Sequence, residues 1–318
     1  MKTNSRICIV ALLLVLLVSV PSYGWSDTGH MAVAFVAYQR LTPQARARVD
    51  ALVRLNPRFS IFNSMIPAGT TAARRRMMLF MLAATWPDKI KSDGQHHADG
   101  PNNGDTPPTD GTADRNIGYS DTAMHKYWHF IDRPFSPDGT ALEDPPIPNA
   151  ETMIGAFRTV LASNSPDKLK SYDLVWLMHV LGDVHQPLHC TSRFTHALIH
   201  GDAGGNFVKV RDGQTTEKLH AFWDGLLGTS SNPAAAIMVG QSAPPPSPAD
   251  ANNLDVSDWI TESFDAAQAT TYMSPPIGLG TGPFVITSGY RNTARALAKK
   301  RVALAGARLA NILNQELR

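Results

Sequence analysis

Two short segments of this chain place histidine and aspartate at a spacing suited to metal binding. His179 and Asp183 are separated by three residues, and so are His220 and Asp224. On a helix this spacing puts the imidazole and the carboxylate on one face, one turn apart. Zinc takes nitrogen and oxygen ligands at about 2.0–2.2 Å, and it can activate water for hydrolysis. Two such helices that face each other would supply the ligands of a hydrolytic zinc centre.

The surroundings of the two pairs favour this interpretation. A single His-x-x-x-Asp pair is more often two polar residues on a solvated helix face. Here both pairs lie in apolar sequence, with Leu181 and Val184 near the first and Phe222 and Trp223 near the second. Buried imidazole and carboxylate groups need polar partners, and one metal ion satisfies both.

Single candidate ligands occur elsewhere in the chain. Each of them has aromatic or apolar neighbours, which favours burial. These further candidates are His30, Asp88, His129 and His189.

Taken in order along the chain, five motifs resemble those of the trinuclear-zinc class I nucleases. They are Trp25-x4-His30, Trp86-Pro87-Asp88, Trp128-His129-Phe130-Ile131-Asp132, His179-x3-Asp183-x5-His189 and His220-x3-Asp224. That family comprises single-strand nucleases and 3′-nucleotidases, and it shares an all-helical fold with the zinc-dependent bacterial phospholipases C. The resemblance runs from Trp25 to the last helix.

The resemblance implies three zinc ions per chain, with Asp183 bridging two of them. The first ion would be bound by Asp88, His129, His179 and Asp183. The second would be bound by the α-amino nitrogen and carbonyl oxygen of Trp25, by His30 and by the other oxygen of Asp183. The third would be bound by His189, His220 and Asp224.

The same resemblance implies the reaction. Water held between two zinc ions would attack phosphorus, with Asp88 as the candidate general base, and the third ion would stabilise the departing 3′ oxygen. The substrates would be single-stranded DNA and RNA, the products would end in 5′-phosphate, and 3′-phosphate would be removed from mononucleotides. The sequence contains no G-x-S-x-G elbow and no P-loop lysine that would suggest another mechanism.

Four residues are candidate substrate contacts by the same resemblance. Phe130 would stack on a base and Asp132 would hydrogen-bond the edge of that base, whereas Lys91 and Asn206 would lie near the phosphate and the metal cluster. From the residues alone, Phe130 is equally well explained as part of the core. Gly225 departs from the polar, base-contacting residue that eukaryotic members often have after the last ligand.

Two other functions remain open from the sequence. A phospholipase C with the same metal cage is the main alternative, but those enzymes end the last pair in His-x-x-x-Glu, whereas this chain has Asp224. A non-enzymatic metal or phosphate binder would be expected to have lost a ligand, and all nine positions are present.

The first 24 residues predict a secretory signal peptide. Lys2 and Arg6 precede an apolar run, and small residues at Ser22 and Gly24 suit cleavage before Trp25. Cleavage would expose the α-amino group that the second zinc requires, and it predicts a secreted or periplasmic protein. It removes two of the 29 basic residues and none of the 27 acidic ones, so the mature charge is near zero. Binding of nucleic acid through a generally basic surface is therefore excluded.

The remaining chain predicts one mainly α, helical-bundle domain from residue 25 to residue 318. Periodicity and caps indicate helices over about 27–38, 43–53, 71–86, 149–163, 167–185, 216–227 and 290–316. Residues 92–122 and 240–250 are expected to be loops, and a small β-hairpin is expected near 200–215. No later stretch predicts a membrane span, Cys190 is expected to be an ordinary core residue, and the protein is expected to be a monomer.

Overall fold

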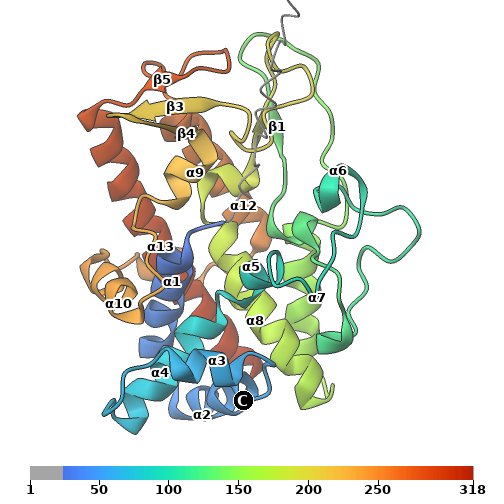
Figure 1. Ribbon diagram of the computed structural model, residues 1–318, viewed down its shortest axis with the longest axis vertical. Coiled ribbons are helices and arrows are strands. Elements are labelled where there is room, and N and C mark those ends of the chain that lie inside the picture. Colours follow the sequence, from blue (N-terminus) through green and yellow to red (C-terminus); the bar gives the residue numbers. More distant parts are fainter. Residues whose placement is uncertain (1–23, 318) are drawn as a thin grey trace, which may run out of the picture.

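The computed structural model describes residues 24–317, so the predicted signal peptide lies outside the described residues except for Gly24. Helices make up most of this part of the chain, and the short strands gather at one end of the molecule (Figure 1). This arrangement confirms the mainly α fold expected from the sequence. No described helix has the length and apolar character needed to cross a membrane.

Six of the seven predicted helices form close to their expected bounds. Thr42 caps its helix by accepting a hydrogen bond from the backbone of Ala45, with proline at the first helical position. The six helices are α1 (Asp27–Arg40), α2 (Pro43–Val53), α4 (Ala72–Ala83), α7 (Ala150–Ala162), α8 (Asp167–Asp183) and α13 (Ser288–Glu316).

Helix α8 is the central element of the bundle. Every residue from Ser171 to Asp183 is buried. A helix that is apolar all around needs neighbours on every side. Helices α1, α2, α7 and α13 pack against it, together with the short helix α5 (Trp86–Ile90). This packing holds the end of α8, with His179 and Asp183, in the interior.

The first and last long helices lie in close contact. Helix α13 packs along α1, and the predicted apolar stripe of α13 is buried, including Ala298, Val302 and Leu309. Gly306 makes this approach possible, because a Cβ atom at that position would lie 2.5 Å from Cβ of Val36. The contact supports the helix that carries His30.

The N-cap residue of α1 is Ser26, and no side chain caps the backbone there. The side chains of Asp27 and Thr28 make tertiary contacts instead: Asp27 pairs with Lys89, and Thr28 donates to the carbonyl of Ser230. The start of α1 is therefore tied to α5 and to the segment after residue 224.

The predicted β-hairpin forms later in the chain than expected. Strand β3 (Lys209–Asp212) pairs antiparallel with β4 (Thr215–Lys218), and β5 (Phe284–Val285) adds to β3 in parallel. Gly213, with φ of 60°, fits the two-residue turn between β3 and β4. Because residues 215–218 are strand, the helix expected over 216–227 is only α9 (Leu219–Asp224). A second pair of strands joins β1 (Pro134–Phe135) to β2 (Ser192–Arg193).

Several short elements were not predicted. These elements are the α-helices α3 (Phe59–Ser64), α6 (Pro101–Gly104), α10 (Pro233–Ser242), α11 (Pro248–Asn252) and α12 (Val256–Ala266), the 3-10 helices η1 (Gly118–Ser120), η2 (Lys126–His129) and η3 (Pro187–Cys190), and the π-helical turn η4 (Ala267–Thr271). The loop expected over 240–250 is therefore shorter, because α10 runs to Ser242 and α11 begins at Pro248.

The long segment predicted as a loop, residues 92–122, contains only α6 and η1 and is fastened to α8. Asn116 donates hydrogen bonds to both carboxylate oxygens of Asp173, at 2.9 and 3.0 Å. The hydroxyl of Tyr119 lies 2.9 Å from that of Ser171. Buried side chains thus hold this loop against the helix that ends at the candidate site.

We expect the folded protein to become less stable as pH rises, in part because of Asp173, and we expect Asp173→Asn to make this decline smaller. Burial raises the pKa of Asp173 from 3.8 to about 7, although Asn116 opposes the shift. The folded state therefore retains a proton that the unfolded state releases, and stability falls as pH rises from about 4 to about 7, by up to ~1.4 kcal/mol per pH unit. Thermal unfolding between pH 5 and 8 should show a shallower decline for the variant.

Asp114→Asn provides the control, because Asp114 is exposed. Its unfolding midpoint should follow that of the parent protein across the pH range. Identical pH slopes for Asp173→Asn and the parent would contradict the prediction.

Candidate metal centre

The predicted ligands come from six elements that meet in the interior. They lie on α1, α5, η2, α8, η3 and α9, and Trp25 immediately precedes α1. At most 6% of any of these residues is exposed. The nine residues are Trp25, His30, Asp88, His129, His179, Asp183, His189, His220 and Asp224.

Asp183 lies between the imidazoles of three elements. Its Oδ2 atom is 2.9 Å from Nδ1 of His129 and 3.4 Å from Nε2 of His179. Its Oδ1 atom is 3.4 Å from Nε2 of His30. The two oxygens of one carboxylate therefore face different histidines, which is the arrangement that a bridging ligand requires.

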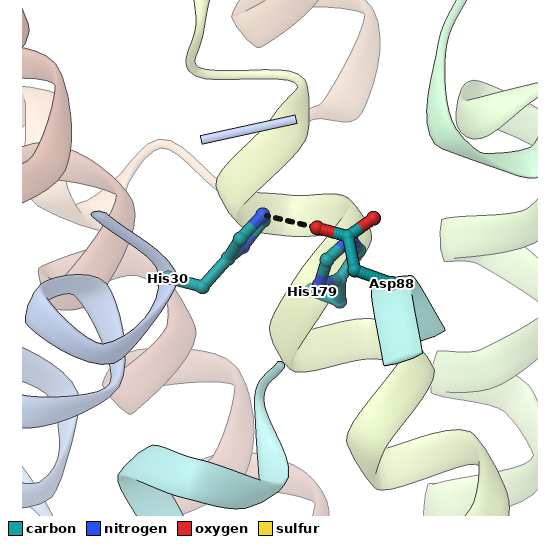
Figure 2. A group of neighbouring side chains, drawn as sticks. All are labelled: His30, Asp88 and His179. Carbon is teal, nitrogen blue, oxygen red and sulfur yellow. Dashed lines mark ion pairs between the residues drawn. The ribbon is translucent and has the colours of Figure 1, made fainter. Parts of the chain in front are cut away.

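Asp88 approaches the same cluster from α5. Its Oδ1 atom is 3.5 Å from Nε2 of His179, and its Oδ2 atom is 3.9 Å from Nε2 of His30. Figure 2 shows these three side chains converging. The imidazole rings of His30 and His179 are stacked, with their centroids 3.7 Å apart. Asp88 thus lies within reach of the ligands expected for both of the first two ions.

The side chains form three groups whose ligand atoms all lie within 4.8 Å of one another. The group predicted for the third ion forms with every side chain that was expected. The other two groups share His179, and Asp88 falls with His30 rather than with His129. The three groups are His189, His220 and Asp224; His129, His179 and Asp183; and His30, Asp88 and His179.

Backbone carbonyls orient three of the histidines. Nδ1 of His179 lies 2.8 Å from the carbonyl of Ala84, Nδ1 of His189 lies 2.8 Å from that of His129, and Nδ1 of His220 lies 2.7 Å from that of Gly204. Each Nδ1 therefore donates, which leaves Nε2 as the atom that can bind a cation. The Nε2 atoms of His189 and His220 are 3.1 Å apart.

The Gly-rich turn before β3 comes close to the third group. Gly204 has φ of 60°, and a Cβ atom there would lie 2.3 Å from the carbonyl oxygen of Leu188 and 3.3 Å from Nδ1 of His220. Only glycine allows the backbone to approach at this distance. The carbonyl of Gly204 is thereby held where it can accept the hydrogen bond from His220.

Buried atoms without hydrogen-bond partners support the interpretation as a metal site. Among the described residues, both ring nitrogens of His30, Nε2 of His129 and His179, and Oδ1 of Asp183 are buried and have no such partner. Unpartnered buried polar atoms are costly, and cations satisfy nitrogen and carboxylate oxygen together. The donor set therefore fits divalent metal ions.

Burial also gives four of the histidines the neutral form that metal binding needs. It lowers the pKa of His30, His129 and His189 well below 6.5, and it lowers the pKa of His220 to about 4. These imidazoles are neutral at physiological pH, which is the form that binds metal ions. Burial alone would raise the pKa of Asp88, but the nearby Lys91 and His179 hold this pKa well below 3.8.

Comparison with known proteins identifies the family of this chain. A family model described as S1/P1 nuclease matches residues 25–318. The chain belongs to the S1/P1 nuclease family. The match spans all nine predicted ligand positions, so the family covers the whole candidate centre.

Curated relatives of this S1/P1 nuclease family member carry nuclease names. Endonuclease 4 of Arabidopsis thaliana is 30% identical over 174 residues, which is 48% of this chain and 54% of that protein. Endonuclease 3 of the same plant is 29% identical over 161 residues, covering 45% of this chain and 50% of that protein. Nuclease S1 of Aspergillus oryzae is 25% identical over 210 residues, covering 64% and 54% respectively. The chain spans about half the length of these relatives, and they give no support to the phospholipase alternative.

The four predicted substrate residues have different surroundings. The side chain of Lys91 is only 4% exposed, and its Nζ lies 2.8 Å from Oδ1 of Asp88, so it contacts a predicted ligand directly. Phe130 directly follows η2 and is partly buried against the core. Burial raises the pKa of Asp132 to about 7, and the nearby carboxylates of Asp202 and Asp105 add to the shift. Asn206 donates to the carbonyl of Ala203.

The segment around Trp25 lies against three other predicted ligands. Trp25 is fully buried, and the backbone N–H of Ser26 donates to the carbonyl of Asp224. A Cβ atom on Gly24 would lie 1.8 Å from Oδ1 of Asp183 and 3.2 Å from Cε1 of His189. The backbone before Trp25 therefore runs directly beside the ligand cluster.

Other histidines lie outside the three groups. His196 and His200 are 78% exposed and pair with Asp138 and Glu143, as expected for surface residues. His185 is fully buried, and its Nε2 accepts a hydrogen bond from Arg308.

The sequence reasoning missed Gln186, which is fully buried beside the third group. A polar residue inside the run Asp183-Val-His-Gln-Pro-Leu-His189 was the signal that could have identified it.

Proposed function

We propose that this protein is a secreted or periplasmic zinc-dependent nuclease. It would hydrolyse single-stranded DNA and RNA to products with 5′-phosphate ends and remove 3′-phosphate from mononucleotides. The observation that carries the proposal is Asp183, whose two oxygens face the imidazoles of different elements at the junction of two ligand groups. The nuclease names of the relatives support the substrate class.

Three zinc ions would be held by the three groups of side chains. Nitrogen and carboxylate oxygen ligands suit zinc, and no cysteine takes part in the groups found among residues 24–317. Bound zinc would supply positive charge for phosphate oxygens and would lower the pKa of a zinc-bound water toward neutral pH. Because the predicted mature charge is near zero, attraction of phosphate depends on this local charge.

The side chains at the centre have separate tasks in this proposal. The side-chain ammonium of Lys91 keeps Asp88 ionised, so that this carboxylate can bind a cation or accept a proton from water. Phe130 offers an aromatic face for a base directly after His129, and Asp132 would hydrogen-bond the edge of that base. Asn206 follows the Gly-rich turn that touches His220, and it would approach the substrate beside the third group.

An activity panel tests the proposal. The purified protein should cleave single-stranded DNA and RNA faster than duplex DNA, and the new ends should carry 5′-phosphate. Chelator should remove the activity, and added zinc should restore it. Hydrolysis of phosphatidylcholine vesicles with no action on single strands would overturn the proposal in favour of a phospholipase.

We expect Phe130→Ala to weaken binding of single-stranded substrates. Stacking of a base on an aromatic side chain contributes about 1–3 kcal/mol, so KM for a short oligonucleotide should rise roughly 5- to 150-fold. Phe130→Trp retains an aromatic face and should keep KM near that of the parent. Steady-state kinetics on the same oligonucleotide measure both variants; an equal loss of kcat in both, with KM unchanged, would indicate a packing role instead.

A further inference from the structure

Gln186 lies between two elements that carry ligands of the third group. It follows the end of α8 and is the N-cap residue of η3, which contains His189. Its side-chain Oε1 accepts a hydrogen bond from the backbone N–H of Leu188 at 2.6 Å. Its Nε2 donates to Oδ1 of Asp224 on α9 at 2.8 Å. One fully buried amide thus joins the two elements.

The backbone decides which way the amide points. The N–H of Leu188 can only donate, so the oxygen of the amide must face it. The NH2 group is then directed at Asp224, whose carboxylate can only accept when ionised. Both contacts are satisfied in one orientation, and the reversed amide would satisfy neither.

The contact leaves one carboxylate oxygen of Asp224 for a cation. Gln186 engages Oδ1, whereas Oδ2 lies 3.5 Å from Nε2 of His220, on the side of the ligand group. The backbone carbonyl of Gln186 also accepts a hydrogen bond from the N–H of His189. The same residue therefore fixes the carboxylate on α9 and the turn that presents His189.

We propose that Gln186 is a positioning residue that holds Asp224 and His189 in the relative positions needed to bind the third metal ion. The proposal rests on the proposed function, because it concerns the ion expected in that group. Residues that hydrogen-bond metal ligands typically raise metal affinity 10- to 100-fold. Loss of Gln186 should therefore weaken one ion of the three and leave the other two bound.

Two substitutions separate the two contacts. Gln186→Glu keeps an oxygen that can accept from Leu188 but replaces the donor to Asp224 with a second carboxylate oxygen. Gln186→Met removes both contacts while keeping a similar length. Each variant should release one zinc ion at a 10- to 100-fold lower chelator concentration than the parent protein. Zinc retained per chain, measured at increasing chelator concentration, is the readout, together with recovery of activity at excess zinc.

Asn116→Asp is the matched control. It makes the same amide-to-acid change against a buried carboxylate, that of Asp173. Asp173 lies ten residues before Asp183 on α8, about 15 Å along the helix axis. This control should lower the unfolding temperature but keep all three zinc ions at parental affinity.

The outcomes distinguish the two proposals. Selective loss of one ion in both Gln186 variants, reversed by excess zinc, supports the positioning role. Parental affinity for all three ions, or equal weakening of all three, would overturn it even if the parent protein is an active zinc nuclease. A parent protein that binds no zinc or cleaves no single strands would instead contradict the proposed function.

Discussion

Asp183→Asn should cause the largest loss of any single side-chain change at the centre. Both oxygens of Asp183 face imidazoles, Oδ1 toward His30 and Oδ2 toward His129 and His179. Asparagine keeps one neutral oxygen and replaces the other with an NH2 group, which cannot bind a cation. Two of the proposed zinc sites are therefore disturbed by one substitution. We expect activity on single-stranded DNA to fall by on the order of 1,000-fold or more, as for loss of a charge-stabilising group.

Asp224→Asn is the comparison for this prediction, because Asp224 belongs to one group only. It should lose a single ion and retain more activity than Asp183→Asn. Zinc content measured on purified proteins, beside rates on the same oligonucleotide, separates the two variants. Small and similar losses in both would argue against a bridging role for Asp183.

One extra residue at the N-terminus should also reduce both zinc binding and activity. A chain that begins at Trp25 has a free α-amino group at the ligand cluster, whereas a chain that begins at Gly24 has a peptide nitrogen there. A peptide nitrogen is a poor ligand because its lone pair is delocalised. Gly24 also lies against Asp183, where even a Cβ atom would be 1.8 Å from Oδ1. We expect the Gly24 form to bind one zinc ion fewer and to lose about 100-fold in activity, as for impaired metal ligation.

Native mass spectrometry of the two forms gives the zinc count, and activity on single-stranded DNA gives the rate. A third protein that begins at Trp25 and carries one added residue after Arg318 controls for chain length, and it should match the Trp25 form. A Gly24 form with three tightly bound zinc ions and full activity would refute the prediction.

Local sequence was sufficient to predict much of the centre. The spacing of His179 and Asp183 placed both on one helix face, and the apolar neighbours implied burial; α8 confirms both points. The group of His189, His220 and Asp224 also forms as expected. These predictions succeeded because a helix converts sequence spacing directly into distance.

Features that depend on tertiary contacts could not be predicted in the same way. Two such features are the contact of Lys91 with Asp88 and the hydrogen bond from Gln186 to Asp224. Predicting either one would require knowing which elements meet in the folded chain. The hairpin forms later than expected, and the glycines of residues 201–205 do not lie in its turn. Gly204 instead brings backbone against Leu188 and His220, and Gly213 lies in the turn between β3 and β4.

Because α1 packs on α13, we expect the centre to assemble only after the C-terminal helix has been synthesised. His30 is among the first residues of the described chain, but the helix that supports it is completed only at Glu316, so the contact spans nearly the full sequence. Contacts of such long sequence separation slow folding. We expect that a ribosome-bound chain lacking α13 acquires no stable metal cluster, and that loading follows release of the finished polypeptide.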